Sequence, residues 1–549
     1  MATTAAAPAA PITAFHLYDT TLRDGSQQEG LTLSVADKLA VARHLDDLGV
    51  TYIEGGWPGA VPRDTEFFAR AAGELELRHA RLAAFGATRK AGVPVAEDPQ
   101  VAALVESGAP TITLVAKSDL RHVTGALRTT AEENLAMVRD TVAHLVGLGR
   151  EVFVDAEHFF DGYVHDADYT TSVLVAAHEA GAGVLVLCDT NGGMLPHQVT
   201  EIIEELRGRL AAAGAGDARL GAHTHNDTGC AVANAIAAVR AGITHVQGCV
   251  NGYGERTGNA DLVTLLGNLQ LKMGMELLPE EMLAETTRIA HAIGEIVNMA
   301  VTPRAPYVGA SAFAHKAGLH ASAIRVDPDL YQHMDPQRVG NDMRMIISDM
   351  AGRASIELKG RELGFDLAGE PEVLSRLAAT VKQREAEGYS YEAADASFEL
   401  LLLDQLGRVP SYSTVESWRA LSQQGRDGTL ESEATVKLVT DGDPEAGGGA
   451  TRERRVAIAE GNGPVNALDL ALRAALRERH PEVDEFELRD FKVRILDAHH
   501  GTDATTRVLV RTTGRGLEFQ TVGVGPNLIE ASWEAIYDAY TYGLFKSGV

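Results

Sequence analysis

The chain has 549 residues, a formal net charge of −27, and apolar and charged fractions of 45% and 23%, which are typical of a globular protein of several domains. The negative charge excludes nucleic acid and anionic membrane surfaces as partners, because it repels both. With three scattered cysteines and no apolar run near the ~20 residues of a membrane span, we expect a cytoplasmic protein without a disulfide framework.

Residues 1–14 carry no basic segment and no long apolar run, so we expect a disordered lead-in rather than a signal peptide. Between residues 15 and 280, strand-like apolar runs alternate with amphipathic helical patterns, the first of which begins at Ser34, with Asp37 three residues on. The strand patterns lie at 15–18, 52–55, 81–85, 111–115, 151–156, 184–188, 219–222 and 245–248. Eight units predict an α/β fold with a (β/α)8 TIM barrel, because the alternative, an open doubly wound sheet, would not need eight.

After the barrel, residues 281–430 have mainly helical patterns, and we expect a helical linker subdomain. Residues 431–549 then contain two groups of strands, each followed by a helix. The strands lie at 432–440, 454–460, 487–496, 506–513 and 517–522, and the helices at 464–477 and 527–545. An acidic, glycine-rich loop at 441–449 interrupts the first group. Because this α+β segment lacks a cluster of acid and base residues, we expect it to bind an effector or a partner subunit.

Three residues far apart in the chain have the side chains of a catalytic metal site. Asp24 follows the first predicted strand, and His223 and His225 end the seventh, where the i, i+2 spacing points both rings to one side. Two imidazoles and one carboxylate leave open positions on a divalent cation. Arg23 adds a forked donor for a carboxylate or keto oxygen. The alternative is a set of unrelated core or surface residues, but the joint pattern favours a metal site.

Other candidate site residues also follow predicted strands. Glu157 comes after the fifth strand, Thr190 after the sixth and Asn259 after the eighth. Enzymes with TIM barrels carry their active sites at the C-terminal ends of the strands. This placement favours a catalytic over a structural metal site.

Three motifs together resemble the family of 2-isopropylmalate, homocitrate and citramalate synthases. They are residues 19–25 with Gln27, residues 223–227, and residues 251–259. The resemblance covers essentially the whole chain, including a terminal module similar to the family's effector-binding domain. Within the family, residues 52–59 and 158–163 are most similar to the citramalate synthases.

The resemblance implies an acyltransferase of isoleucine biosynthesis that condenses acetyl-CoA with a 2-keto acid, pyruvate, giving (R)-citramalate and CoA. It implies a divalent ion, Mg²⁺, Mn²⁺ or Zn²⁺, on Asp24, His223 and His225, with Asn259 completing the ligand set. Such an ion can chelate a keto acid and act as a Lewis acid.

The resemblance also assigns roles to the other candidate residues. Arg23 would stabilise the developing oxyanion, Gln27 and Thr190 would bind substrate, and Glu157 would orient acetyl-CoA or a water. For acid and base chemistry the family uses a His and a Tyr that reach across a dimer, and these fall here on the two residues His320 and Tyr331. The linker at 281–430 would thus complete the active site. A homodimer and isoleucine as the effector of 431–549 are also implied.

Four alternatives stay open on the sequence. A 2-isopropylmalate synthase would take 2-ketoisovalerate, and apolar pockets discriminate by only ~1–3 kcal/mol per methylene, so the choice of pyruvate depends on the resemblance. A biotin-dependent carboxyltransferase would carry a Met-Lys-Met acceptor or use a separate carrier. The Glu255–Arg256 loop and the terminal module argue against an acyl-CoA lyase. A non-catalytic amino-acid sensor would have no need of Arg23 beside three metal ligands.

Overall fold

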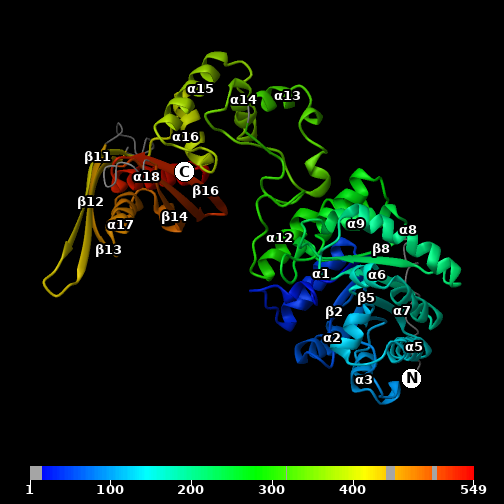
Figure 1. The fold of residues 1–549 in the computed structure, drawn as a ribbon. Helices are drawn as coiled ribbons and strands as arrows, with labels where there is room; N and C mark the ends of the chain where they lie inside the picture. Colours follow the sequence, from blue (N-terminus) through cyan, green and yellow to red (C-terminus); the bar gives the residue numbers. More distant parts are fainter. Residues whose placement is uncertain (1–14, 317, 441–451, 497–503) are drawn as a thin grey trace, which may run out of the picture. The chain divides into compact units, whose positions relative to one another are not determined.

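The structure, a computed structural model, describes residues 15–316, 318–440, 452–496 and 504–549 and divides into two units (Figure 1). The first unit runs through Phe313 and includes Met334–Asp342, and the second comprises Ala314–His333 and Met343–Val549. The predicted lead-in at 1–14 and loop at 441–449 lie outside the described residues. These two units are compact parts of the structure, whereas the predicted boundaries at residues 280 and 430 separate functional domains, and those boundaries stay a prediction.

Eight parallel strands close into a barrel in the first unit, which confirms the predicted α/β TIM-barrel fold. The strands are β1 (His16–Asp19), β2 (Tyr52–Gly56), β3 (Arg81–Ala87), β4 (Thr111–Lys117), β5 (Glu151–Glu157), β6 (Val184–Asp189), β7 (Leu220–Thr224) and β8 (His245–Gly248). Spatial order follows chain order, and β8 pairs with β1 to complete the ring. Each strand predicted between residues 15 and 248 overlaps an observed one.

Helices surround the barrel. They are α1 (Val35–Leu48), α2 (Pro62–Glu74), α3 (Pro99–Glu106), α4 (Leu120–His122), α5 (Ala131–Gly147), α6 (Phe159–His165), α7 (Ala167–Glu179), α8 (Pro196–Ala212), α9 (Ala231–Arg240), α10 (Leu262–Gly267), α11 (Glu280–Leu283) and α12 (Thr286–Ile296). The predicted capping box starts α1: Asp37 N donates to Ser34 Oγ at 3.1 Å, and Ser34 N donates to Asp37 Oδ2 at 2.8 Å. The segment Met334–Asp342 is attached to α12, since Thr287 Oγ1 donates to the Val339 carbonyl at 2.6 Å.

A layer of polar side chains crosses the inside of the barrel below its C-terminal mouth. The Tyr18 hydroxyl donates to Glu54 Oε2 at 2.7 Å and lies 2.6 Å from Thr113 Oγ1. Gln247 Nε2 donates to Asp155 Oδ1 at 3.0 Å. Buried polar groups are costly unless they are paired, and these five residues pair with one another.

The second unit contains helices and two antiparallel sheets. Its elements are β9 (Ala314–His315), α13 (Gly318–Ile324), β10 (Arg344–Met345), α14 (Arg353–Glu362), α15 (Pro371–Ala386), α16 (Asp395–Gln405), β11 (Thr414–Gln424), β12 (Leu430–Thr440), β13 (Glu453–Gly461), α17 (Pro464–Arg477), β14 (Glu487–Ile495), β15 (Thr506–Gly514), β16 (Leu517–Gly525) and α18 (Leu528–Lys546). The sheets β11–β13 and β14–β16, each followed by a helix, match the predicted repeat. Strand β11 was missed, because its mostly exposed polar side chains show no strand alternation and its pairing with β12 defines it.

Among the described residues, none of the helices combines the length and apolar character that a bilayer span requires. Helices α17 and α18 instead pack on the two sheets, around a shared core that includes Leu472, Val508 and Ile536. On another side of α18, Ser397 of α16 donates to Asp538 Oδ2 at 3.2 Å. Burial, reinforced by the charge of Glu534, raises the pKa of Asp538 to about 7.

This pKa makes the stability of the second unit depend on pH. An unfolded aspartate titrates near ~3.9, so the folded state binds its proton more tightly, and the resulting stability is lost as pH rises toward 7. We expect Asp538→Asn, which stays neutral, to raise the free energy of unfolding at pH 8 by roughly 1–3 kcal/mol and to change little below pH 4. Urea denaturation followed by the fluorescence of Trp418 and Trp533 measures this. The exposed Glu530→Gln on the same helix is the control, and an unaltered pH dependence in Asp538→Asn would contradict the expectation.

Candidate active site

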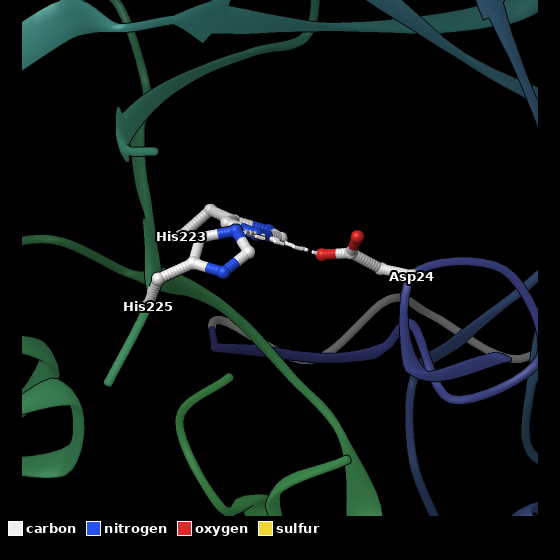
Figure 2. A group of neighbouring side chains, drawn as sticks. All are labelled: Asp24, His223 and His225. Carbon is white, nitrogen blue, oxygen red and sulfur yellow. Dashed lines mark hydrogen bonds and ion pairs between the residues drawn. The ribbon is translucent and has the colours of Figure 1, made fainter. Parts of the chain in front are cut away.

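Asp24, His223 and His225 come together at the C-terminal mouth of the barrel, with the carboxylate facing the two rings (Figure 2). His223 Nε2 lies 3.1 Å from Asp24 Oδ2 and 3.1 Å from His225 Nε2, and His225 Nε2 lies 3.8 Å from Asp24 Oδ2. All three side chains are buried. Ligand bonds of about 2.0–2.2 Å place neighbouring donor atoms roughly 3–3.5 Å apart. The geometry therefore fits a single divalent ion.

Asn259 supplies a second observation that fits a cation. The residue is buried beside His225, to which an isolated bridge connects it. Its Nδ2 donates to the Tyr253 carbonyl at 3.0 Å, whereas its Oδ1 has no hydrogen-bond partner among the described residues. Buried polar atoms without partners are rare in folded proteins, and an amide oxygen is a suitable ligand for a hard cation.

Electrostatics prepare Asp24 and His225 to bind a cation. Although burial opposes it, the charge of Arg23 and the contact with His223 hold the pKa of Asp24 well below its ordinary value. Burial, with the nearby His223, lowers the pKa of His225 to about 4. Against its own burial, the hydrogen bond with Asp24 raises the pKa of His223, so a cation has to displace a proton from this ring. At neutral pH the carboxylate is thus ionised and His225 is neutral, as ligands must be.

The turn after β1 is held by Asp19 and Thr21, two residues of the motif at 19–25 to which the sequence analysis gave no role of their own. Thr21 donates to the Asp19 carboxylate twice, from its backbone N at 2.9 Å and from Oγ1 at 2.8 Å. Thr21 Oγ1 in turn accepts from Val250 N at 2.9 Å. These bonds attach the loop after β8 to the loop after β1 and so hold Asp24 and Asn259 in the same part of the barrel mouth.

Arg23 is held on three sides. Its Nε donates to Glu54 Oε1 at 2.5 Å, a guanidinium nitrogen lies 3.2 Å from Asp24 Oδ1, and Cζ lies 3.8 Å from the Phe85 ring centroid. The Phe85 ring contacts the Trp57 ring edge to face at 5.2 Å. A guanidinium fixed in this way is preorganised to meet charge at a defined position.

A cavity of about 540 Å³ opens at the barrel mouth. Seven of the predicted site residues line it: Arg23, Asp24, Gln27, Glu157, Thr190, His223 and His225. Glu157 forms an ion pair with Lys117, a cavity residue that the sequence analysis missed. Thr190 Oγ1 accepts from His158 N at 2.8 Å.

The other two predicted catalytic residues lie in the second unit. The rings of His320 and Tyr331 stack with centroids 4.1 Å apart. The structure thus brings these two residues to each other, and their chemical role stays a prediction.

Known protein families match along the chain. Residues 14–293 match the HMGL-like family, residues 307–388 match a homocitrate synthase post-HMGL domain-like family, and residues 392–544 match the LeuA allosteric (dimerisation) domain. These matches cover both the barrel and the terminal module.

Full-length relatives agree with these families and confirm the predicted resemblance. The (R)-citramalate synthase of Streptomyces coelicolor is 61% identical over 97% of each chain, and that of Aquifex aeolicus is 46% identical over 97% of this chain and 98% of its own. A probable 2-isopropylmalate synthase of Methanopyrus kandleri is 32% identical over 91% and 94%. The chain therefore belongs to the HMGL-like family and, within it, to the group of full-length relatives that includes the (R)-citramalate synthases.

Proposed function

We propose that this chain is an acyltransferase that condenses acetyl-CoA and pyruvate, with water, to give (R)-citramalate and CoA in the cytoplasm, as a step of isoleucine biosynthesis. The observation that carries the proposal is the convergence of Asp24, His223 and His225 beside Arg23 at the mouth of the barrel cavity. Identity of 61% over 97% of an (R)-citramalate synthase supports the choice of reaction.

The reaction needs a polarised keto carbonyl and a carbon nucleophile. When bound, a divalent ion supplies Lewis acidity toward the keto acid. Arg23 donates to the carbonyl oxygen as negative charge develops there, and Glu54 and Phe85 keep the guanidinium in position. Gln27 and Thr190, on the wall of the same cavity, donate to the substrate carboxylate.

The nucleophile forms when the methyl group of the thioester loses a proton. Glu157 lines the cavity and orients acetyl-CoA or the water that later hydrolyses the thioester, and Lys117 holds the Glu157 carboxylate. We infer that His320 and Tyr331 exchange protons with the reacting groups across the proposed dimer, as the resemblance implies. Their stacked rings support a joint role.

Two large rings next to Arg23 support pyruvate over a branched keto acid. Phe85 lies against the guanidinium, and Trp57 contacts Phe85 while lining the same cavity. A methyl group fits beside two such rings more easily than the isopropyl group of 2-ketoisovalerate.

The terminal module supports assembly and regulation. Apolar side chains are exposed at alternate positions on β13 (Val456, Ile458) and on β14 (Phe491, Val493, Ile495). Neighbouring exposed apolar residues mark interaction surfaces, and a second copy of the chain is the usual partner. We infer a homodimer formed through this module, with isoleucine as its effector.

The proposed metal ligands predict the effect of removing one. His223→Ala should weaken the binding of divalent ions at least tenfold and abolish release of free CoA, while the barrel stays folded. Metal content after dialysis, thiol release and circular dichroism measure these effects. His165→Ala, at an exposed position ending α6, is the control. Full turnover and full metal content in His223→Ala would rule out this site.

The substrate assignment predicts a preference among keto acids. Thiol release with acetyl-CoA should be fastest with pyruvate, slower with 2-ketobutyrate and 2-ketoisovalerate, and absent with a chelator. Trp57→Ala should raise kcat/KM for 2-ketoisovalerate relative to pyruvate about tenfold, since it opens the wall beside Arg23. A wild-type preference for 2-ketoisovalerate would favour 2-isopropylmalate formation instead.

The effector proposal predicts inhibition by isoleucine. No side chain caps the N-terminus of α17, whereas Asn527 Oδ1 already accepts from Ile529 N at the start of α18. Free helix N-termini bind carboxylates, so Gly463→Asp, which places a carboxylate there, should raise the inhibitory isoleucine concentration about tenfold. Asn527→Asp is the matched control. Unchanged turnover of the wild type with isoleucine would contradict the proposal.

A further inference from the structure

One side chain connects a metal ligand to the inside of the barrel. Gln247, on β8, is only 1% exposed, and its Oε1 lies 2.7 Å from His223 Nδ1. Its Nε2 donates to Oδ1 of Asp155, a buried residue of β5, at 3.0 Å and lies 3.4 Å from His245 Nε2. The amide thus bridges β7, β8 and β5 beneath the cluster of Asp24, His223 and His225.

The partners of this amide determine its orientation. When ionised, the Asp155 carboxylate accepts hydrogen bonds and does not donate them, so the Gln247 NH2 group faces it. His245 Nε2 lies on the same side and can also accept from that group in the tautomer that carries its proton on Nδ1. The amide carbonyl is therefore left facing His223. A reversed amide would place the Gln247 oxygen against the Asp155 carboxylate, and both of these groups are acceptors.

The orientation of Gln247 in turn determines the tautomer of His223. A carbonyl only accepts, so Nδ1 of His223 carries the proton that it donates to Gln247. When the ring is neutral, its lone pair is then on Nε2, the atom that lies 3.1 Å from both Asp24 Oδ2 and His225 Nε2. A cation can bind only that lone pair. His225 has no such support, because its buried Nδ1 lacks a hydrogen-bond partner among the described residues.

We propose that Gln247 is the positioning residue that keeps His223 in its metal-binding tautomer, and that Asp155 acts through Gln247 by fixing the direction of the amide. This inference rests on the proposed metal site. It assigns to two interior residues of the barrel a part in ion affinity, although neither touches the ion.

The first test removes the acceptor of Gln247 at nearly constant volume. In full-length, metal-free protein, Gln247→Leu should bind Mn²⁺, Zn²⁺ and Co²⁺ 10–100-fold more weakly in competition with a chelator. The absorption spectrum of bound Co²⁺ should also change, because one ligand is lost or reoriented. Tyr18→Phe is the control: it removes a buried hydroxyl from the same polar layer without touching His223, and its affinity should stay within threefold of wild type.

The second test uses a pair of variants at Asp155. Asp155→Asn retains an oxygen that accepts from Gln247, but its NH2 group can also donate to a reversed amide, so its affinity should lie between those of the wild type and Asp155→Leu. Asp155→Leu removes the acceptor and frees the amide to reverse, so it should weaken binding as Gln247→Leu does. Asp155 and Gln247 act through one hydrogen-bonded chain. The double variant Asp155→Leu with Gln247→Leu should therefore lose no more ion affinity than Gln247→Leu alone. If Gln247→Leu does not fold, the comparison of Asp155→Asn with Asp155→Leu decides.

Each outcome separates this inference from the proposed function. Wild-type affinity in folded Gln247→Leu, or equal affinities in Asp155→Asn and Asp155→Leu, would overturn the positioning role and leave the metal site intact. Equal ion binding by wild type and His223→Ala would instead overturn the metal site, and the inference with it.

Discussion

The candidate metal site depends on the hydrogen bonds that close the barrel. Asp24 follows β1, whereas His223 and His225 lie at the end of β7, and these two strands do not pair with each other. Strand β8 lies between them and pairs with both, so its register fixes the distance across which the carboxylate meets the imidazoles. The loop after β8, attached through Thr21 and Val250, brings Asn259 to the same place. A single strand therefore aligns every proposed ligand.

Two polar branches extend from this mouth into the barrel. One runs from Arg23 through Glu54 to Tyr18 and Thr113, and the other runs from His223 through Gln247 to Asp155. An apolar interior would be less costly to build, since each buried polar group must find a partner. What the network provides is orientation, because each branch ends on a side chain that must meet the substrate or the ion in one geometry.

The alternation of apolar runs was enough to predict all eight barrel strands, and the i, i+2 spacing on an extended strand was enough to select His223 and His225. Strand β11 could not be predicted, since only Val415, Trp418 and Ala420 pack on the core and an irregularity between Val415 and Ser417 interrupts their alternation. Glu54, Asp155 and Gln247 were missed for another reason: a periodic pattern does not say which inward side chains meet across a barrel. A polar residue within a buried parallel strand is nevertheless unusual, and that signal could have marked all three.

The chain crosses between the two units three times, because Met334–Asp342 returns to the first unit before the second resumes. Within that return, a side chain at Gly340, where φ is 69°, would meet the Ala284 carbonyl oxygen at 2.0 Å. The first unit is therefore made of two separate segments of the chain, and a single cut cannot separate it whole from the second unit. A truncation at Phe313 would remove Met334–Asp342 from its place on α12 and so leave the first unit incomplete.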